Sequence, residues 1–398
     1  MTGTPDRAIE ILAQLVGFDT TSHLSNLAII EFIEDYLARH GVESRRIESD
    51  DGRKSNLLAT IGPMQDGGVV LSGHTDVVPV SGQNWSSDPF ELTGRMVDGQ
   101  ARQYGRGSAD MKGFIAAVLD KVPEMVAADL KTPFHIALSY DEEVGCRGVG
   151  RMIAQMGHAA PMPALTIVGE PTSMQIVNAH KGIRGFETLF TGVAAHSSAP
   201  QLGASAISFT GEFIGFLNGL AAEAEAAANP ESGFTPPWTT FNIGQIEGGE
   251  ALNIISERCL VSWEFRPLLD VDADAIEARV KGYLDDELRP RMKAAHRDAD
   301  VAMTPLAAVP PLREEPDSAA ERLVRYLTGA NATQTAAYVA EASQFQLHGI
   351  PAVLCGPGDI VQAHQPDEWI ADSDMAACAA FLDRLIAWSV SGAPVPGA

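Results

Sequence analysis

Hydrophobic residues near the start of the chain recur at the spacing of an α-helix. Ile9, Leu12 and Leu15 fall on one helical face. Thr4 is suited to cap this helix and Pro5 to occupy its first turn, where the missing backbone N–H costs nothing. The pattern therefore predicts that the chain opens with an amphipathic helix.

Short apolar runs and helical patterns then alternate along the chain. The runs are apolar at successive positions, as expected for strands that are covered on both faces. Strands are predicted over residues 56–61, 67–73, 134–140 and 164–169, and helices over 26–41, which ends at a glycine, and 112–128. This alternation favours an α/β sheet with helices on both sides.

The pattern changes near residue 180 to strands in which polar and apolar positions alternate. Such strands are half exposed, which favours one sheet with helices on a single face. Strands are predicted over 184–192, 239–249 and 255–267, and helices over 204–228 and 272–292. The α/β pattern returns with apolar segments at 320–329, 350–358 and 374–390.

The order of these patterns predicts a larger α/β domain that is interrupted by a smaller α+β domain. The predicted boundaries are 1–179 for the first part of the larger domain, 180–293 for the insert and 294–398 for the second part. A chain of 398 residues with 45% hydrophobic content exceeds the size at which one core usually keeps growing, which agrees with two domains.

The charge narrows the range of partners. Lys and Arg number 28 against 52 Asp and Glu, which gives a formal net charge of −24. This charge argues against nucleic acid and against an anionic membrane surface, and leaves a neutral or cationic small molecule. The alternative is that the acidity only keeps the protein soluble.

The first residues show no basic segment followed by an apolar one, and no run approaches the roughly 18 apolar residues of a membrane span. We therefore expect a cytoplasmic protein.

Four cysteines are scattered without a close pair, so buried, reduced thiols are predicted rather than disulfides or thiolate metal clusters: Cys146, Cys259, Cys355 and Cys378.

Titratable residues gather where the predicted strands end. His74 and Asp76 close the strand that begins at 67, and their spacing of two sends both side chains to the same side. Further candidates follow other strands or precede a helix: Asp110, the pair Glu142 and Glu143, Glu170 and His364. Because ligands gather at the carboxyl ends of strands in α/β sheets, we expect these residues to converge.

Two histidines and several carboxylates without cysteine suit a divalent ion such as zinc, cobalt or manganese. Their number also allows a pair of ions that share one carboxylate. Each residue alone has a plainer interpretation: a hydrogen-bonded histidine, a solvated pair of glutamates, or Asp110 as the cap of the following helix. Their recurrence at strand ends favours the metal site.

Seven motifs, in this order, resemble those of the M20 family of two-zinc metallopeptidases and deacylases. They are GHTDVVP, YGRGSADMKGF, DEEVG, GEPTS, AHKG, HSSAP and HQPDE, and they cover nearly the whole chain. The resemblance implies a zinc-exopeptidase-like domain with a mixed sheet flanked by helices, interrupted by a smaller α+β lid or dimerisation domain. It also implies a homodimer and an N-acyl amino acid as substrate.

The resemblance also assigns roles to the candidate residues. It implies that Asp110 bridges two metal ions, that His74 and Glu170 bind one of them, and that Glu143 and His364 bind the other. Two further residues have implied roles beside the ligands. Glu142 is then the general base, and Asp76 accepts the remaining ring N–H of the first histidine.

The insert carries the remaining candidates. His196 resembles the family histidine that helps to hold the oxyanion, in dimeric members from the partner subunit. Asn253, Arg266 and Arg184 are candidate substrate-binding residues, although each is equally suited to a structural hydrogen bond. Deacylases, carboxypeptidases and dipeptidases share the metal set, so the reaction class is better defined than the substrate. A further hypothesis is a metal-dependent binding protein without catalytic activity. Such a protein would normally lack a metal ligand or the general base.

Overall fold

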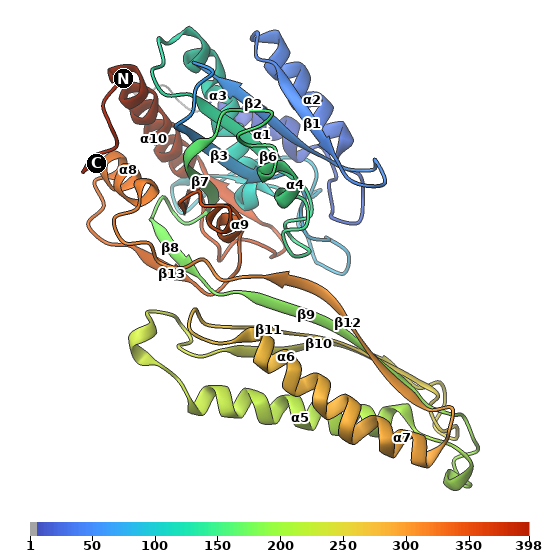
Figure 1. Ribbon diagram of the computed structural model, residues 1–398. Helices are drawn as coiled ribbons and strands as arrows, with labels where there is room; N and C mark the ends of the chain where they lie inside the picture. Colours follow the sequence, from blue (N-terminus) through green and yellow to red (C-terminus); the bar gives the residue numbers. More distant parts are fainter. Residues whose placement is uncertain (1–5, 398) are drawn as a thin grey trace. The chain divides into compact units, whose positions relative to one another are not determined.

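The computed structural model describes residues 6–397, so the assignments of Thr4 and Pro5 lie outside the described residues. The chain forms two compact units (Figure 1). Of the described residues, unit 1 comprises those up to Ala179, the segment Leu312–Gln334 and those from Ala340 onward. Unit 2 comprises His180–Pro311 and the short segment Thr335–Val339. Unit 2 is thus inserted into the sequence of unit 1.

Unit 1 contains most of a mixed sheet whose strand order is β1-β2-β6-β3-β7-β14-β8-β13, although two of the three residues of β13 are assigned to unit 2. The central strands β6, β3, β7 and β14 run parallel, whereas β1 and β2 add antiparallel neighbours. The strands are β1 (Ser44–Glu48), β2 (Ser55–Ile61), β3 (Gly68–His74), β6 (Phe134–Ser139), β7 (Pro163–Pro171), β8 (Val177–His180), β13 (Gln334–Ala336) and β14 (Ala352–Gly356). The predicted fold class, a mixed sheet flanked by helices, is confirmed.

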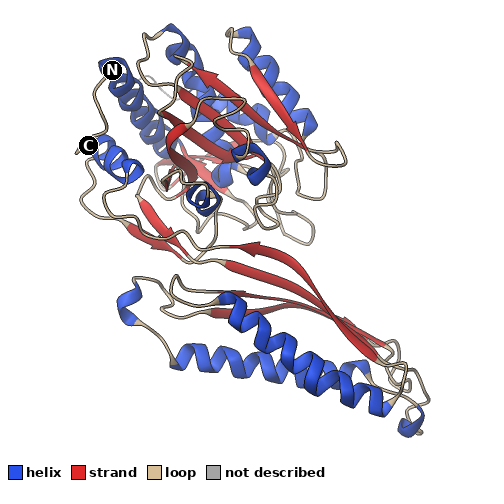
Figure 2. Ribbon diagram, in the orientation of Figure 1, coloured by secondary structure: helices blue, strands red, loops and turns tan. Residues whose placement is uncertain are grey.

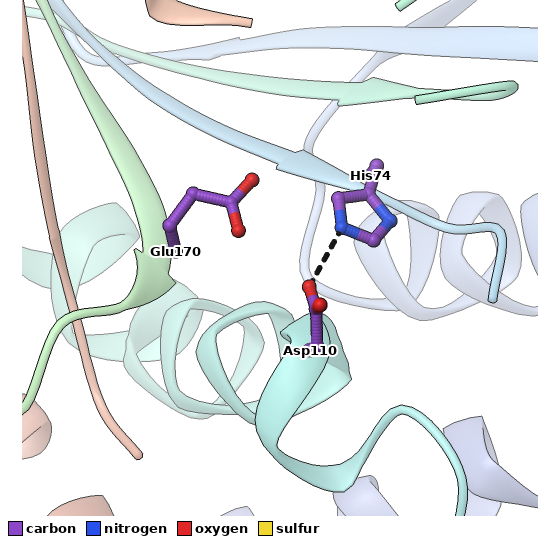
Figure 3. A group of neighbouring side chains, drawn as sticks. All are labelled: His74, Asp110 and Glu170. Atoms are coloured by element: carbon purple, nitrogen blue, oxygen red, sulfur yellow. Dashed lines mark hydrogen bonds and ion pairs between the residues drawn. The ribbon is translucent and has the colours of Figure 1, made fainter. Parts of the chain in front are cut away.

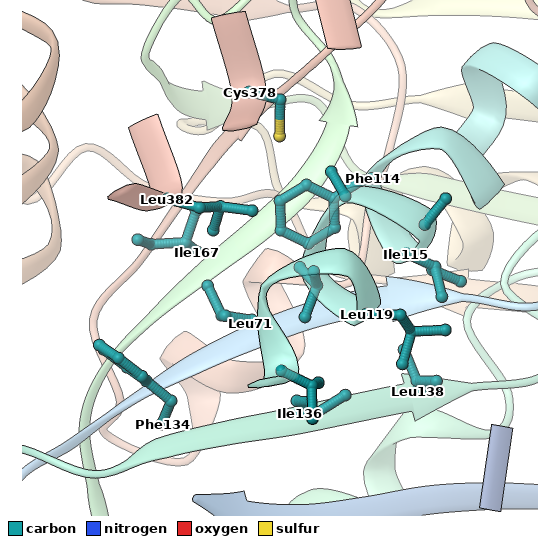
Figure 4. Packing of buried hydrophobic residues seen from close by; sticks show 14 of the residues in the cluster. Leu71, Phe114, Ile115, Leu119, Phe134, Ile136, Leu138, Ile167, Cys378 and Leu382 are labelled. Carbon is teal, nitrogen blue, oxygen red and sulfur yellow. The ribbon is translucent and has the colours of Figure 1, made fainter. Parts of the chain in front are cut away.

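Helices cover both faces of this sheet. Alternate strand residues such as Leu71, Ile136 and Ile167 join one large apolar cluster with residues of α1, α2, α3, α8 and α10 (Figure 4). Buried residues of α4 and α9 lie outside that cluster, and these two helices contact the sheet from its other face. The helices are α1 (Asp6–Val16), α2 (Leu27–Arg39), α3 (Gly113–Ala127), α4 (Val149–Ile153), α8 (Ala319–Thr328), α9 (Ala342–Leu347) and α10 (Asp372–Ser391).

A smaller sheet in unit 1 joins segments that are far apart in the sequence. Its strand order is β15-β5-β4, with β4 at Thr93–Val97, β5 at Gln100–Tyr104 and β15 at Trp369–Ala371. β15 pairs antiparallel with β5, which places Trp369 opposite Tyr104. The chain then passes from β5 through the turn Ser108–Lys112 into α3. This pairing brings the segment before α3 next to the segment before α10.

Unit 2 is an antiparallel sheet with helices on one face (Figure 2). Its strand order is β10-β11-β9-β12, and rings including Phe186, Trp263 and Phe213 form its core beneath the helices. The elements are β9 (Ile183–Thr191), α5 (Ala206–Ala226), β10 (Thr240–Gly248), β11 (Arg258–Arg266), α6 (Ala273–Gly282), a π-helical segment (Tyr283–Leu288), α7 (Arg289–Ala295) and β12 (Asp300–Val309). Two short 3-10 turns lie at Pro200–Leu202 and Pro230–Ser232.

The strand β12 continues the smaller sheet beyond the boundary at 293 that the sequence pattern suggested. It pairs antiparallel with β9, from Asp300 opposite Thr191 to Val309 opposite Ile183. Most of its residues are exposed or half-buried and Pro305 interrupts its register, so it lacks the apolar alternation that marks a strand.

No helix within residues 6–397 is both long and apolar enough to cross a membrane. All four cysteines are buried as free thiols, as the scattered spacing predicted.

Candidate metal centre

Three parallel strands deliver titratable residues to one edge of the large sheet. His74 is the last residue of β3, Glu142 and Glu143 follow β6, and Glu170 lies near the end of β7. Because β6, β3 and β7 are parallel neighbours, their carboxyl ends meet at the same edge. His74, Glu142 and Glu170 are all buried there.

Asp110 stands at the centre of the arrangement. Its Oδ1 lies 3.0 Å from Nε2 of His74, and its Oδ2 lies 3.4 Å from Nε2 of His364. The same nitrogen of His364 is 3.0 Å from Oε2 of Glu143. One buried carboxylate therefore faces two imidazoles that come from opposite ends of the sequence.

The five residues form two groups that share Asp110. His74, Asp110 and Glu170 make one group (Figure 3), and Asp110, Glu143 and His364 make the other. In each group one potential ligand atom per residue lies within 4.8 Å of the others. The structure thus brings together all five residues that the family resemblance assigns as metal ligands, and Asp110 belongs to both groups.

Buried carboxylates lie close together at this edge. Burial raises the pKa of Glu142 and of Glu170 well above the usual range, and neighbouring carboxylates add to the effect. Hydrogen bonds to Asp110 and Glu143 raise the pKa of His364 to about 11. Among the described residues, Oε1 of Glu170 is buried without a hydrogen-bond partner. An excess of buried carboxylates and an orphaned oxygen fit a site for divalent cations.

The ring of His74 is oriented for metal binding. Its Nδ1 lies 2.9 Å from the carbonyl oxygen of Asp76, and because a carbonyl only accepts, this nitrogen donates the bond. Nε2 faces Oδ1 of Asp110 at 3.0 Å, so this is the nitrogen that would bind a cation held beside Asp110. The sequence had suggested that the carboxylate of Asp76 accepts this N–H, but Oδ1 lies 3.8 Å away and the carbonyl takes the bond instead.

The carboxylate of Asp76 organises the loop after β6. It accepts hydrogen bonds from the backbone N–H of Glu142 at 3.1 Å, from that of Glu143 at 3.3 Å and from Oγ of Ser22 at 2.7 Å. The two glutamate side chains then diverge. Glu143 reaches His364, whereas Oε1 of Glu142 accepts only a long bond from Sγ of Cys146 at 3.5 Å, among the bonds of the described residues.

A family model supplies the deciding comparison. The model described as "Peptidase family M20/M25/M40" matches residues 70–388, a range that includes both ligand groups. The chain belongs to the M20/M25/M40 peptidase family. It is therefore a metal-dependent amidohydrolase by class, and the resemblance that its motifs indicated is confirmed.

Named M20 relatives match almost the full length. The chain is 33% identical over 396 residues to an acetylornithine deacetylase of Pasteurella multocida, covering 96% of this chain and 98% of the relative. It is 35% identical over 389 residues to one of Myxococcus xanthus, covering 96% and 97%.

Solved structures share the fold of this M20 chain at lower identity. An M20 metallo-carboxypeptidase of Sulfolobus solfataricus superposes with a TM-score of 0.75 at 18% identity, covering 97% of this chain and all of the other. A dinuclear metal-binding M20 peptidase of Bacillus subtilis gives a TM-score of 0.58 at 15% identity, covering 99% and 100%.

His196 lies in unit 2 of this M20 chain, on an exposed loop that forms an isolated bridge with Ile254. The backbone N–H of Ser198 donates to its Nδ1 at 3.2 Å. Since Nδ1 accepts this bond, the proton of the neutral ring is on Nε2, which is therefore a hydrogen-bond donor.

The predicted substrate-binding residues also lie in unit 2. Arg184 donates to Asp274 at 2.7 Å and Arg266 to Glu264 at 2.8 Å, so each guanidinium already has a carboxylate partner. Asn253 is exposed, and its carbonyl accepts from the backbone N–H of Ser197 at 3.0 Å. Each of these contacts is explained by a structural role within unit 2.

Two buried carboxylates near the candidate metal centre were not among the residues singled out from the sequence. Burial raises the pKa of Glu341 to about 7, and Oγ of Ser72 donates to it at 3.4 Å. Glu368 accepts hydrogen bonds from the turn that holds Asp110. Glu341 does not directly follow a predicted strand, whereas Glu368 is the last residue of the HQPDE motif.

Proposed function

We propose that this M20 amidohydrolase removes the acetyl group from N2-acetyl-L-ornithine and releases L-ornithine and acetate, a step of arginine biosynthesis. The observation that carries the proposal is the likeness over nearly the full chain to relatives named acetylornithine deacetylase, at 33% and 35% identity. The alternative is another deacylase or peptidase of the family, such as a succinyl-diaminopimelate desuccinylase, aminoacylase, carboxypeptidase or dipeptidase.

The proposed cofactor is a pair of divalent ions, zinc or else cobalt or manganese. Asp110 would bind both ions, His74 and Glu170 would bind one of them, and Glu143 and His364 would bind the other. This assignment follows the two groups of residues that share Asp110. Imidazole and carboxylate ligands without thiolate suit these ions. When bound, such ions polarise the amide carbonyl and lower the pKa of water.

Glu142 is the proposed general base. It belongs to neither ligand cluster, it is buried at the same sheet edge, and its backbone is fixed by Asp76. In this role its carboxylate takes a proton from the attacking water and returns it to the nitrogen of the departing amine. Retention of this glutamate beside a complete ligand set argues against a silent binding protein.

His196 is the proposed donor to the oxyanion, through the N–H at Nε2. His196→Ala should lower kcat by roughly 10²–10³-fold with unchanged metal content, because one oxyanion donor is lost. His296→Ala is the matched control, since the backbone N–H of Asp298 donates to Nδ1 of His296 at 3.2 Å in the same local pattern. A His196→Ala enzyme as fast as the control would contradict the role.

The proposal includes a cytoplasmic homodimer in which His196 acts on the partner's site. Mixed dimers of Glu142→Ala and His196→Ala chains then regain part of the activity, because some hybrid sites combine an intact base with an intact histidine. No recovery in verified mixed dimers would mean that His196 acts within its own chain or not at all.

A substrate panel tests the proposed function directly. Metal-reconstituted protein is assayed with N2-acetyl-L-ornithine, N-succinyl-diaminopimelate, N-acetylated neutral amino acids and dipeptides. We expect kcat/KM to be at least about tenfold higher for N2-acetyl-L-ornithine than for the others, since pocket contacts decide such ratios. A higher kcat/KM for a dipeptide or for the succinylated substrate would favour the alternative.

A further inference from the structure

A buried carboxylate outside both ligand groups lies against the turn that carries Asp110. Glu368 is only 1% exposed. Its Oε1 accepts the backbone N–H of Ala109 at 2.9 Å and that of Asp110 at 3.0 Å. Its Oε2 accepts the backbone N–H of Gly107 at 3.1 Å. One side chain therefore fixes three backbone groups of the turn.

This turn needs an acceptor from elsewhere in the chain. Gly107 precedes the segment Ser108–Lys112, and Ala109 and Asp110 lie in its first turn, where backbone N–H groups have no partner within a helix. Asp110 and Met111 also depart from helical geometry, with φ/ψ of −119°/93° and −132°/35°. A buried N–H without a partner is costly, and a carboxylate is the strongest acceptor that the chain can offer. Glu368 thus stabilises a backbone shape that directs Asp110 toward both imidazoles.

Arg106 neutralises this carboxylate and extends the network. Its side chain is also 1% exposed, and its Nη1 donates to Oε2 of Glu368 at 2.7 Å. The same Nη1 donates to the carbonyl of Gln365 at 3.3 Å, and Nη2 donates to Oε1 of Gln83 at 2.6 Å. These further hydrogen bonds offset part of the cost of burying the charge pair, although Nε of Arg106 has no hydrogen-bond partner among the described residues.

The network also reaches the loop of His364. Nε2 of Gln83 donates to the carbonyl of His364 at 2.9 Å, while its Oε1 accepts from Arg106. Pairing of β15 with β5 holds the two segments side by side, and the backbone N–H of Gly105 donates to the carbonyl of Glu368 at 3.0 Å. Contacts of the same few residues therefore set both Asp110 and the backbone that carries His364.

We propose that Glu368, with Arg106, is the positioning residue of the metal centre: it holds the shared carboxylate and the loop of His364 at the separation that two cations require. It touches neither the substrate nor the reacting atoms. The inference rests on the metal site of the proposed function. Because the shared Asp110 is its target, loss of Glu368 affects the binding of both ions.

Glu368→Gln tests the proposal with Co²⁺ alone as the probe. The amide offers one acceptor atom, so its NH₂ group must face N–H donors where the second oxygen stood. We expect Co²⁺ affinity, from chelator competition, to fall about 10–100-fold for both ions, with a changed visible absorption spectrum that reports altered coordination. Activity is not needed for either readout.

Glu321→Gln is the matched control. Glu321 is a buried carboxylate of unit 1 that accepts from Arg325 at 2.8 Å and from Asn178 at 3.0 Å, and it belongs to neither ligand group. It should lose stability without losing Co²⁺ affinity. Equal weakening of Co²⁺ binding in the two variants would reduce Glu368 to a general stabiliser and overturn the proposal.

Further outcomes separate the inference from the function on which it rests. Wild-type Co²⁺ affinity and spectrum in Glu368→Gln would overturn the inference alone. A wild-type protein that binds no Co²⁺ would overturn the proposed metal centre and the inference with it. If Glu368→Gln fails to fold, Arg106→Lys serves, since lysine keeps the charge but cannot reach all three acceptors. Its Co²⁺ affinity should fall about tenfold, and an unchanged value would contradict the role.

Discussion

Asp110→Ala is expected to abolish hydrolysis and to remove both metal ions from the protein. The reason is that Asp110 is the one residue common to the two ligand groups, with Oδ1 facing His74 and Oδ2 facing His364. Metal per chain, measured by elemental analysis after dialysis, should fall from two to near zero. Glu143→Ala should lose chiefly the ion that it shares with His364.

A second aspartate serves as the control for this change. Asp120 lies in α3, in the same unit, and is paired with Arg7 at 3.6 Å rather than with any ligand residue. Asp120→Ala should keep two ions and the wild-type rate. An Asp110→Ala protein that retained two ions with unchanged affinity would remove the case for a bridging carboxylate.

Glu142→Ala is expected to keep both ions and to lose activity by about 10²–10⁴-fold, the usual contribution of a general base. Its neighbour Glu143 contacts His364, whereas Glu142 belongs to neither ligand group. The two alanine variants should therefore differ in metal content: Glu142→Ala keeps both ions, whereas Glu143→Ala loses one. Elemental analysis and kcat, measured on both alanine variants, separate proton transfer from metal binding.

Two results would contradict the roles of Glu142 as base and Glu143 as ligand. Loss of one ion from Glu142→Ala, or a full complement of ions in Glu143→Ala, would exchange the roles of the pair. Glu142→Gln is the complementary variant, because it preserves the size of the side chain and removes its ability to accept a proton.

The sequence could place candidate ligand residues because strand ends are local features. Runs such as 67–73 and 134–140 have few alternatives to buried strands, and parallel neighbours must bring their carboxyl ends together. His74 and Glu170 could therefore be selected before any contact was known. The family motifs then distinguished Glu142 from Glu143, which spacing alone leaves equivalent.

Other features depend on contacts between distant segments and could not be predicted in this way. Two of the three hydrogen-bond donors to the carboxylate of Asp76 are backbone N–H groups 66 and 67 residues away, and no side-chain pattern indicates backbone donors. The role of Glu368 depends on the pairing of β15 with β5, two short strands separated by most of the chain. β12 was missed because an exposed edge strand has little apolar alternation.

Insertion of unit 2 into unit 1 imposes an order on synthesis at the ribosome. β14 lies inside the sheet between β7 and β8, and α10 adds Phe381 and Leu382 to the core, yet these segments are made after unit 2. His364 comes from the same late stretch. A nascent chain that has already produced residues 180–311 therefore still has an open β7 edge and lacks His364, one of the five candidate metal ligands. Such an edge can pair with other chains until synthesis is complete.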